Sequence, residues 1–284
     1  MKKILIIGNL GFIGKRLEEY LKDKFEISTY DIKENKKKFD GSQTFGGVDT
    51  VIHLGAFTSV GDSMVNTIEC LYNNILFFAE YVDLAKSYGV KHFIYASSSS
   101  VYGDDNKPKS FYAATKKMNE MQAEIYSNEY NMAFTGLRFH NVYGKNMRDN
   151  QAISIFTKAI KNNRDIVVNG DGLIKRDFTY VDDVCKVIES LINVTPSWKH
   201  KVFDVGTGTN TTIKNLIYTI IDLVNPSYNG HILYAKENSY DAKITLADLT
   251  ELSKVIGEAN LPTIKLIDGL KKMINTENKF YNEL

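Results

Sequence analysis

Residues 8–14 read GNLGFIG, and the expected architecture of the chain can be inferred starting from them. Gly8, Gly11 and Gly14 stand between an apolar run, KKILIIG (2–8), and a stretch with helical apolar spacing from Phe12 to Leu21. Glycine suits such a turn because the turn is tight, a pyrophosphate approaches the backbone, and the helix packs closely on the strand. Free N–H groups at the helix start attract phosphates. The stretch therefore predicts a dinucleotide-binding turn, with Gly8, Gly11, Phe12, Ile13 and Gly14 as cofactor contacts.

An acidic residue after the next apolar run strengthens this prediction. Asp31 ends FEISTYD (25–31), 17 residues after Gly14, where a carboxylate can accept hydrogen bonds from adenosine ribose hydroxyls. Its charge would repel a 2′-phosphate, which favours NAD over NADP, although Lys33 and the lysine run 36–38 leave NADP open. A turn residue at a strand end is the other interpretation of Asp31. We expect Asp31 and Ile32 to contact the cofactor.

The first half of the chain continues as alternating strands and helices. We expect strands at 49–55, 91–97 and 133–139, and helices at 62–87 and 111–130. Such alternation predicts βαβ units and a doubly wound, mostly parallel α/β (Rossmann) sheet, with binding sites at the carboxyl ends of the strands.

The second half is less regular. We expect helices near 151–162, 181–193, 212–224, 248–256 and 263–275, and strands near 202–206 and 231–236. This pattern predicts a smaller C-terminal α/β substrate domain. Residues 1–142 and about 178–205 would form the NAD-binding domain, and about 143–177 and 206–284 the substrate domain.

The composition restricts the classes of partner that we expect the protein to bind. The chain has 284 residues, with 35 Lys plus Arg against 34 Asp plus Glu, so it has no strong charge to attract nucleic acid. The two cysteines, Cys70 and Cys185, form no disulfide framework or metal-binding spacing, and the five histidines are scattered. The apolar runs are shorter than the ~20 residues of a membrane span, and the one at the N-terminus is short for a signal peptide. We expect a soluble, cytoplasmic protein with no nucleic-acid, membrane or metal partner.

A tyrosine and a lysine stand four residues apart in FYAATKK (111–117). On a helix, Tyr112 and Lys116 would share one face. A phenol has a pKa of about 10 and is a poor base at neutral pH. A nearby ammonium and a nicotinamide cation would both lower that pKa. Taken alone, the pair can also be a core aromatic residue beside a solvated lysine.

Seven motifs together resemble the extended short-chain dehydrogenase/reductase family, within its NAD-dependent epimerase/dehydratase branch, and are most similar to UDP-glucuronate and UDP-glucose 4-epimerases. The motifs occur in the family's order: GNLGFIG, HLGA (53–56), Asn74, ASSSSVYG (96–103), YAATKK (112–117), TGLRFHNVYG (135–144) and GDGLIKRDFTYVDDV (170–184). The resemblance is strong over residues 1–225 and weaker beyond them.

The resemblance implies a catalytic set. Tyr112 would be the acid/base, Lys116 its partner, and Ser98 a hydroxyl that orients the proton; a polar loop is the other interpretation of the serine run. Ser99 and Ser100 stand where related dehydratases carry an Asp-Glu pair, so no local acid is present for elimination. This favours epimerisation through a transient 4-keto sugar.

The resemblance also assigns binding residues. Arg176 would pair with the substrate diphosphate, since a guanidinium forms two parallel hydrogen bonds with phosphate oxygens; a surface pair with Asp177 is the alternative. The remaining implied cofactor contacts are Leu54, Gly55, Ala56, Asn74, Ser97, Tyr112, Lys116, Phe139 and His140. The remaining implied substrate contacts are Ser98, Ser99, Ser100, Tyr112 and Asn141.

Three departures from the family affect the substrate. Residues 32–51 are too few for the family's extra strand and helix, so we expect the helix ahead of HLGA to be missing and adenine recognition to be reduced. The loop between Gly103 and Tyr112 is short, which predicts a more open sugar site. The family's second arginine clamp has no counterpart in 235–250, where Lys236 or Lys243 is the available cation.

The leading hypothesis is an NAD-dependent nucleotide-sugar 4-epimerase, with a UDP-sugar the first candidate substrate. A 4-keto sugar-nucleotide reductase or dehydrogenase using NAD(P), and a non-catalytic NAD-binding regulator, remain alternatives. The family usually dimerises through the helices expected at 62–87 and 111–130, so we expect a homodimer. Phe77, Phe78, Met118 and Met121 would serve either that interface or the core.

Overall fold

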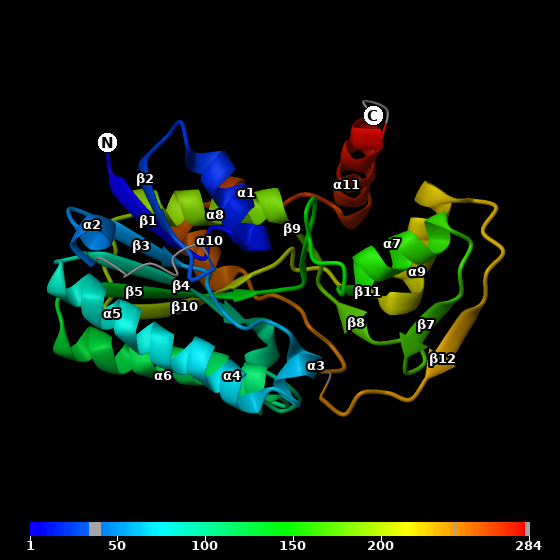
Figure 1. Cartoon of the computed structure of the whole chain (residues 1–284), viewed down its shortest axis with the longest axis horizontal. Helices are drawn as coiled ribbons and strands as arrows, with labels where there is room; N and C mark the ends of the chain where they lie inside the picture. The colour runs from blue at the N-terminus through cyan, green and yellow to red at the C-terminus, as the bar shows by residue number, and fades with distance from the viewer. Residues whose placement is uncertain (34–40, 241, 282–284) are drawn as a thin grey trace.

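The apolar runs of the first half form a six-stranded, wholly parallel sheet in the order β10-β5-β4-β3-β1-β2 (Figure 1). The computed structural model describes residues 1–33, 41–240 and 242–281. The strands of the sheet are β1 (Lys3–Ile7), β2 (Glu26–Tyr30), β3 (Thr50–His53), β4 (His92–Ser98), β5 (Ala133–Phe139) and β10 (His200–Val205). The predicted fold class, a doubly wound parallel sheet, is confirmed.

The sheet places a crevice at the end of β1. In the parallel register, Ile7 pairs with Tyr30 of β2 on one side and with His53 of β3 on the other. After β2 the chain crosses back over β1 to form β3, so the winding direction reverses between β1 and β3. Ligands of doubly wound sheets bind outside the carboxyl ends of the strands at such a reversal.

Two layers of helices bury the two faces of the sheet. The alternation of side chains along β1 sends Ile4 and Ile6 into one core and Leu5 and Ile7 into the other. The first core is covered by α1 (Phe12–Leu21), α8 (Val181–Asn193) and α10 (Thr250–Ile256). The second is covered by α2 (Gly41–Phe45), α5 (Phe77–Ser87) and α6 (Phe111–Glu129), and Figure 1 shows α5 and α6 side by side.

The segment after β3 differs from the single helix expected at 62–87. It contains α3 (Val60–Ser63), α4 (Thr67–Leu71), a π-helical turn (Tyr72–Leu76) and then α5. Asn66 has non-helical backbone angles, φ −102° and ψ 52°, and separates α3 from α4. Apolar periodicity does not reveal such breaks, because the buried face continues across them.

The expectation of no helix ahead of HLGA was also wrong. One short helix, α2, remains there, and its Phe45 is fully buried in the second core. Residues 34–40, which include the lysine run, lie outside the described residues.

A third core belongs to the smaller, C-terminal part of the chain. It is enclosed by α7 (Ala152–Lys161), α9 (Ile213–Val224) and α11 (Leu266–Tyr281), with three strand pairs beside them. The pairs are β6 (Val142–Tyr143) with β9 (Thr179–Tyr180), β7 (Ile166–Asn169) with β12 (Ile232–Ala235), and β8 (Lys175–Arg176) with β11 (Thr211–Thr212). Most of these strands have two residues, too few for an alternating pattern.

Two segments are buried in a different core from that of the domain to which the sequence analysis assigned them. Leu252 and Ile256 of α10 belong to the core beneath the large sheet, although 206–284 was assigned to the substrate domain. Phe178 and Tyr180 belong to the third core, although 178–205 was assigned to the NAD-binding domain. The domain boundaries themselves stay a prediction.

Candidate active site

The glycine turn lies where β1, β3 and α1 meet. Gly8 has φ +89°, and a Cβ there would lie 2.5 Å from the backbone N of Gly55. A Cβ on Gly14 would collide with the carbonyl oxygen of Gly8. The first turn of α1 carries no acidic residue, and its N-cap, Gly11, has no side chain to cap the free N–H groups. The turn is therefore shaped and charged to receive an anionic group against its backbone.

Asp31 lies beside this turn and lines the same cavity. Its two carboxylate oxygens accept hydrogen bonds from the backbone N–H groups of Leu10, at 3.2 Å, and Lys33, at 2.9 Å. Asp31 therefore shapes the strand-end turn and also lines the cavity, and its contact with the cofactor stays a prediction. Ile32 lines the cavity next to it.

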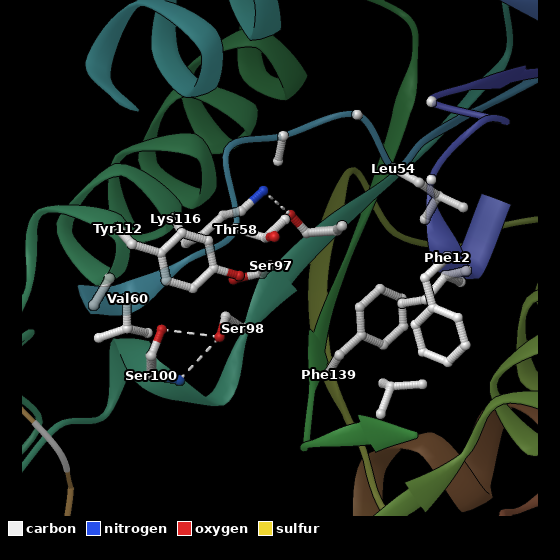
Figure 2. Close-up of a pocket in the computed structure, with 18 of the residues that line it drawn as sticks. Phe12, Leu54, Thr58, Val60, Ser97, Ser98, Ser100, Tyr112, Lys116 and Phe139 are labelled. Carbon is white, nitrogen blue, oxygen red and sulfur yellow. Dashed lines mark hydrogen bonds between the residues drawn. The ribbon is translucent and has the colours of Figure 1, made fainter. Parts of the chain in front are cut away.

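Tyr112, Lys116 and Ser98 converge at the middle of this cavity, which has a volume of about 460 Å³ (Figure 2). Tyr112 and Lys116 come from the first turns of α6, which begins at the N-cap Ser110; the Ser110 hydroxyl accepts from the backbone N of Ala113. Ser98 ends β4. Figure 2 shows Ser98 and Ser100 close to the Tyr112 ring, and Phe12 and Phe139 on the other side of the cavity.

The serine run forms a small shelf, which we define as Ser98–Ser100. The Ser98 hydroxyl accepts hydrogen bonds from the backbone N of Ser100, at 3.2 Å, and from the Ser100 hydroxyl, at 2.9 Å. These bonds leave the Ser98 hydroxyl proton available for a group in the cavity. The interpretation of the run as a plain polar loop is not supported, since all three serines line the cavity.

Burial controls the charges of the pair. It lowers the pKa of Lys116 to about 8, and the ammonium donates to the carbonyl oxygen of Ala96 at 2.9 Å. Burial raises the pKa of the Tyr112 phenol, while the hydrogen bond with Ser98 and the charge of Arg148 oppose that rise. Arg148 is thus a cation that lowers the pKa of Tyr112, and the expected effect of Lys116 on that pKa stays a prediction.

Arg148 is a cavity residue that sequence reasoning missed. It lies in the irregular segment between β6 and α7, where neither periodicity nor a motif marks a functional position. The same holds for Thr58, which Figure 2 shows near Tyr112. Both belong to segments whose course depends on the packing of distant elements.

Most of the implied contacts line the cavity, but two do not. Leu54, Gly55, Ala56, Ser97 and Phe139 line it, as do Asn141 and Arg176. His140 does not; it is fully buried, with Nε2 at 3.5 Å from Asp204 Oδ2. Phe139 and Asn141 face the cavity, and the residue between them points the other way, as side chains along an extended chain alternate. The proposed cofactor contact of His140 is not supported.

Asn74 is also buried outside the cavity wall, at the centre of the π-helical turn. Its side-chain amide accepts from the backbone N of Phe57 at 2.7 Å and donates to the Phe57 carbonyl at 3.0 Å. It also donates to the Thr115 hydroxyl at 2.8 Å. Asn74 thus holds the loop after β3 against the catalytic helix, which is a positioning role rather than a cofactor contact.

Arg176 lines the cavity, and the alternative surface pair with Asp177 is not found. Asp177 is fully buried, and its carboxylate accepts from the backbone N atoms of Thr207, Gly208 and Ala247. Its backbone carbonyl accepts from the side-chain amide of Asn141, which also donates to the Thr245 hydroxyl.

Tyr240 and the segment 242–248, which we call the strap, contribute the last part of the wall. Tyr240, Ala242 and Thr245 line the cavity, whereas Lys236 and Lys243 do not. These two lysines therefore gain no support as a second phosphate clamp.

The short loop after Gly103 folds back on itself. Asp105 and Asn106 have φ of 58° and 59°, and Lys109 forms an ion pair with Asp104 at 2.8 Å. Gly103, Lys109 and Ser110 line the cavity. The loop is thus a tight turn beside the cavity, and whether it opens the sugar site stays a prediction.

Comparisons with known proteins agree with this geometry. The profile of the NAD dependent epimerase/dehydratase family matches residues 4–206. The chain belongs to this family. It is 30% identical to Protein CapI of Staphylococcus aureus over 99% of this chain and all of the relative. It is 28% identical to the UDP-glucuronate 4-epimerase of Thermodesulfobacterium geofontis, covering 95% of this chain and 94% of that protein. Among solved structures, MoeE5 in complex with UDP-glucuronic acid and NAD is 25% identical, with a TM-score of 0.88 over 98% of this chain and 99% of that one.

The members of this family depend on NAD, and the site of this chain fits it. A Cβ at Gly8 or Gly14 would collide with neighbouring backbone, so glycine allows the strand, the turn and α1 to approach closely. The uncapped N–H groups at the start of α1 then suit a pyrophosphate. Asp31 lies beside the glycine turn, and Lys116 with Tyr112 lines the middle of the same cavity.

None of the helices in residues 1–33, 41–240 and 242–281 is long and apolar enough to cross a membrane. Over the same residues, no group of three or more His, Cys, Asp or Glu side chains is arranged to hold a metal ion.

Proposed function

We propose that the protein is an NAD-dependent nucleotide-sugar 4-epimerase that acts on a UDP-sugar. The observation that carries the proposal is the convergence of Tyr112, Lys116 and Ser98 in one cavity. That cavity runs from the glycine turn at one end to two arginines, Arg148 and Arg176, at the other. The curated relatives named as UDP-glucuronate 4-epimerases support the reaction class.

Each residue of the site has a separate role in the proposed reaction. Tyr112 takes the proton of the sugar 4-hydroxyl, and Ser98 orients that hydroxyl by a hydrogen bond. Lys116 keeps a positive charge beside the cofactor ribose. Bound NAD would supply the hydride acceptor and donor for sugar C4, by which the 4-keto sugar would form and be reduced again on its opposite face. Tyr112 then gives the proton back, so the protein and its cofactor end as they began.

Arg176 is the residue that we assign to the diphosphate. Its backbone is fixed because β8 pairs with β11 and because the next residue, Asp177, is buried and holds two loops. A firmly placed guanidinium can bind two phosphate oxygens at once. Anchoring the diphosphate leaves the sugar as the part that turns between the two hydride transfers.

Arg148 favours a sugar with a negative charge. It lies close enough to Tyr112 for its charge to lower the pKa of the phenol. A carboxylate on the sugar would be neutralised there, whereas a neutral sugar would leave the guanidinium without that partner. Within the UDP-sugars, we therefore place a uronic acid ahead of a neutral hexose.

The experiment is to incubate the purified protein with UDP-, dTDP-, GDP- and ADP-sugars and to follow the sugar C4 proton by NMR. We expect inversion at C4 for UDP-glucuronic acid, without added cofactor, and a near-UV spectrum showing retained NAD(H). Turnover only with added NADPH or NADH would instead identify a keto-sugar reductase. Retained cofactor without conversion of any sugar nucleotide would identify a regulator.

We further propose that the protein is a homodimer in the cytoplasm. An apolar face lies over two neighbouring helical segments; its exposed members are Val65, Ile68, Tyr72 and Leu76 before α5, and Met118, Met121 and Ile125 on α6. Val65 and Ile68 are 83% and 78% exposed, which is costly for a monomer. A two-fold axis would bury this face against itself as a four-helix bundle. Phe78, in contrast, is 1% exposed and belongs to the core.

Both cysteines are free and buried, which suits a reducing compartment such as the proposed cytoplasm.

Light scattering tests the dimer. We expect twice the mass of the chain for the native protein and a monomer for Met121→Lys, which places a charge in the centre of this face. Lys117→Met, a neighbouring exposed change on α6, should remain a dimer. A native protein that scatters as a monomer would contradict the proposal.

A further inference from the structure

Glu120 is a buried carboxylate on the catalytic helix, α6, and it takes no part in the proposed proton and hydride transfers. Glu120 lies one turn beyond Lys116 and is 4% exposed. Its carboxylate accepts from the Ser97 hydroxyl at 2.7 Å, and Arg138 of β5 donates to both of its oxygens, at 2.7 and 2.8 Å. This two-bond pairing fixes the guanidinium in one orientation.

Arg138 is linked to the serine shelf through Tyr102. Its third donor reaches the hydroxyl of Tyr102 at 2.7 Å. Tyr102 lies two residues after the shelf, and its backbone N donates to the Ser99 carbonyl at 3.2 Å. The position of the Tyr102 ring therefore bears on the backbone that carries Ser98 and Ser100.

The same hydroxyl joins the network to the strap. Tyr102 donates to Asp204 Oδ1 at 2.9 Å, and Asp204 Oδ2 accepts from the backbone N of Asp248 at 3.0 Å. Three residues earlier, the Thr245 hydroxyl accepts from Asn141 and lines the cavity. The Tyr102 hydroxyl thus accepts a hydrogen bond from Arg138, which pairs with the catalytic helix, and donates one to Asp204, which bonds the strap.

The charges of the network do not change near neutral pH. Arg138 and the Ser97 hydroxyl outweigh burial and hold the pKa of Glu120 below its usual value. Burial and Asp204 raise the pKa of Tyr102 to about 12, so its hydroxyl keeps the proton that it donates. The network is therefore built to hold positions, not to transfer protons at neutral pH.

We propose that Tyr102 is a positioning residue for the proposed epimerase reaction. Held by Arg138 and Glu120, it keeps the serine shelf at its working distance from Tyr112 and couples the shelf to the strap at the sugar end. The tyrosine and arginine of the SVYG and GLRF motifs are thereby given one shared role. The inference rests on the proposed function for its kinetic part only.

Tyr102→Phe tests the proposal, since it removes the bridging hydroxyl and keeps the ring. We expect kcat to fall by about 10- to 100-fold, as for other small displacements of catalytic groups, with retained NAD unchanged. Tyr95→Phe is the matched control. It removes another buried hydroxyl, which is bonded to His200 at the first residue of β10, and should leave kcat within about two-fold.

A double-mutant cycle separates positioning from general loss of structure. If Tyr102 acts through the shelf, Tyr102→Phe should cost little more in a Ser98→Ala background, because the group that it positions is already gone. An equal loss in both backgrounds would overturn the proposal. So would an unchanged kcat in Tyr102→Phe alone.

Hydrogen exchange gives a readout that needs no activity. Tyr102→Phe should speed exchange in peptides that cover 98–103 and 242–248, and leave those of α1 unchanged. Unchanged exchange in both regions would overturn the coupling. If the native protein converts no sugar nucleotide, the proposed function fails, and the exchange experiment still decides whether Tyr102 links the shelf to the strap.

Discussion

At the cofactor end of the cavity the wall is mostly backbone, and at the sugar end it is mostly side chains from separate segments. Gly8 lies so close to the backbone of Gly55 that it has no room for a Cβ, and both glycines belong to short motifs. The sugar end combines the shelf, Arg148, Arg176 and the strap, which are far apart in the sequence. Backbone shape follows from local sequence, whereas a set of side chains requires the finished fold. The difference explains why the cofactor is easier to identify than the sugar.

The largest effect should come from removing the phenol hydroxyl where the two ends meet. We expect Tyr112→Phe to lower kcat by about 10²–10⁴-fold, because proton transfer to and from the sugar hydroxyl is lost. Retained NAD should be unchanged. Tyr143→Phe is the control, since it removes a buried hydroxyl that bonds only Leu266 among the described contacts. Comparable turnover in Tyr112→Phe and native protein would disprove the catalytic assignment.

The backbone character of the cofactor end is tested by Gly8→Ala. The Cβ would meet the Gly55 backbone at 2.5 Å, with φ at +89°, so we expect a loss of about 3 kcal/mol in stability and loss of retained NAD. Gly172→Ala has a similar φ, +77°, but ordinary contacts of 3.5 Å or more. It should cost about 1 kcal/mol from strain alone. Urea unfolding of both variants makes the comparison, and equal losses would show that the clash is relieved.

The buried positive charge of Lys116 should lower the free energy of unfolding of the protein. Its folded-state pKa of about 8 is below the ordinary 10.5, so below about pH 8 the folded state carries the full penalty of a buried charge. The penalty is relieved as pH rises from about 8 to 10.5. In NAD-free protein at pH 7, we expect Lys116→Met to raise the free energy of unfolding by about 1–3 kcal/mol.

That gain should shrink by pH 10. Urea unfolding at both pH values measures it, and the half-exposed Lys117, as Lys117→Met, should change stability by less than about 0.5 kcal/mol. A gain from Lys116→Met that is the same at pH 7 and pH 10 would mean that the Lys116 pKa is not depressed.

The smallest expected effect is a shift in the pH profile of kcat, and it distinguishes Arg148 from Arg176 at the sugar end. Arg148 lowers the pKa of Tyr112 by its charge, so Arg148→Gln should raise that pKa and reduce the phenolate fraction at a given pH. The acidic limb of the kcat profile should then move to higher pH. Arg176→Gln should raise KM for the nucleotide sugar and leave the limb in place. A limb that moves with Arg176 and not with Arg148 would reverse the two assignments.

Several elements could be predicted almost to the residue. The strand at 133–139 and the helix at 181–193 have the predicted ends, because each has a clear period and a clear boundary. The single helix at 62–87 was wrong, because the π-helical turn at Tyr72–Leu76 accompanies buried hydrogen bonds of Asn74 with Phe57 and Thr115, which sequence spacing does not reveal.

The site shows the same division. The sequence by itself determined the glycine turn, the acid after β2, the Tyr-Lys pair and the serine run, since each is a local pattern with a chemical reason. Only the tertiary structure decided that Arg148 lines the same cavity as Tyr112, that His140 turns away, and that Tyr102 bonds both Arg138 and Asp204. Such contacts join residues far apart in the chain, and a side chain's partners there depend on how the intervening elements pack. Local patterns therefore specify the chemistry, and packing specifies which groups surround it.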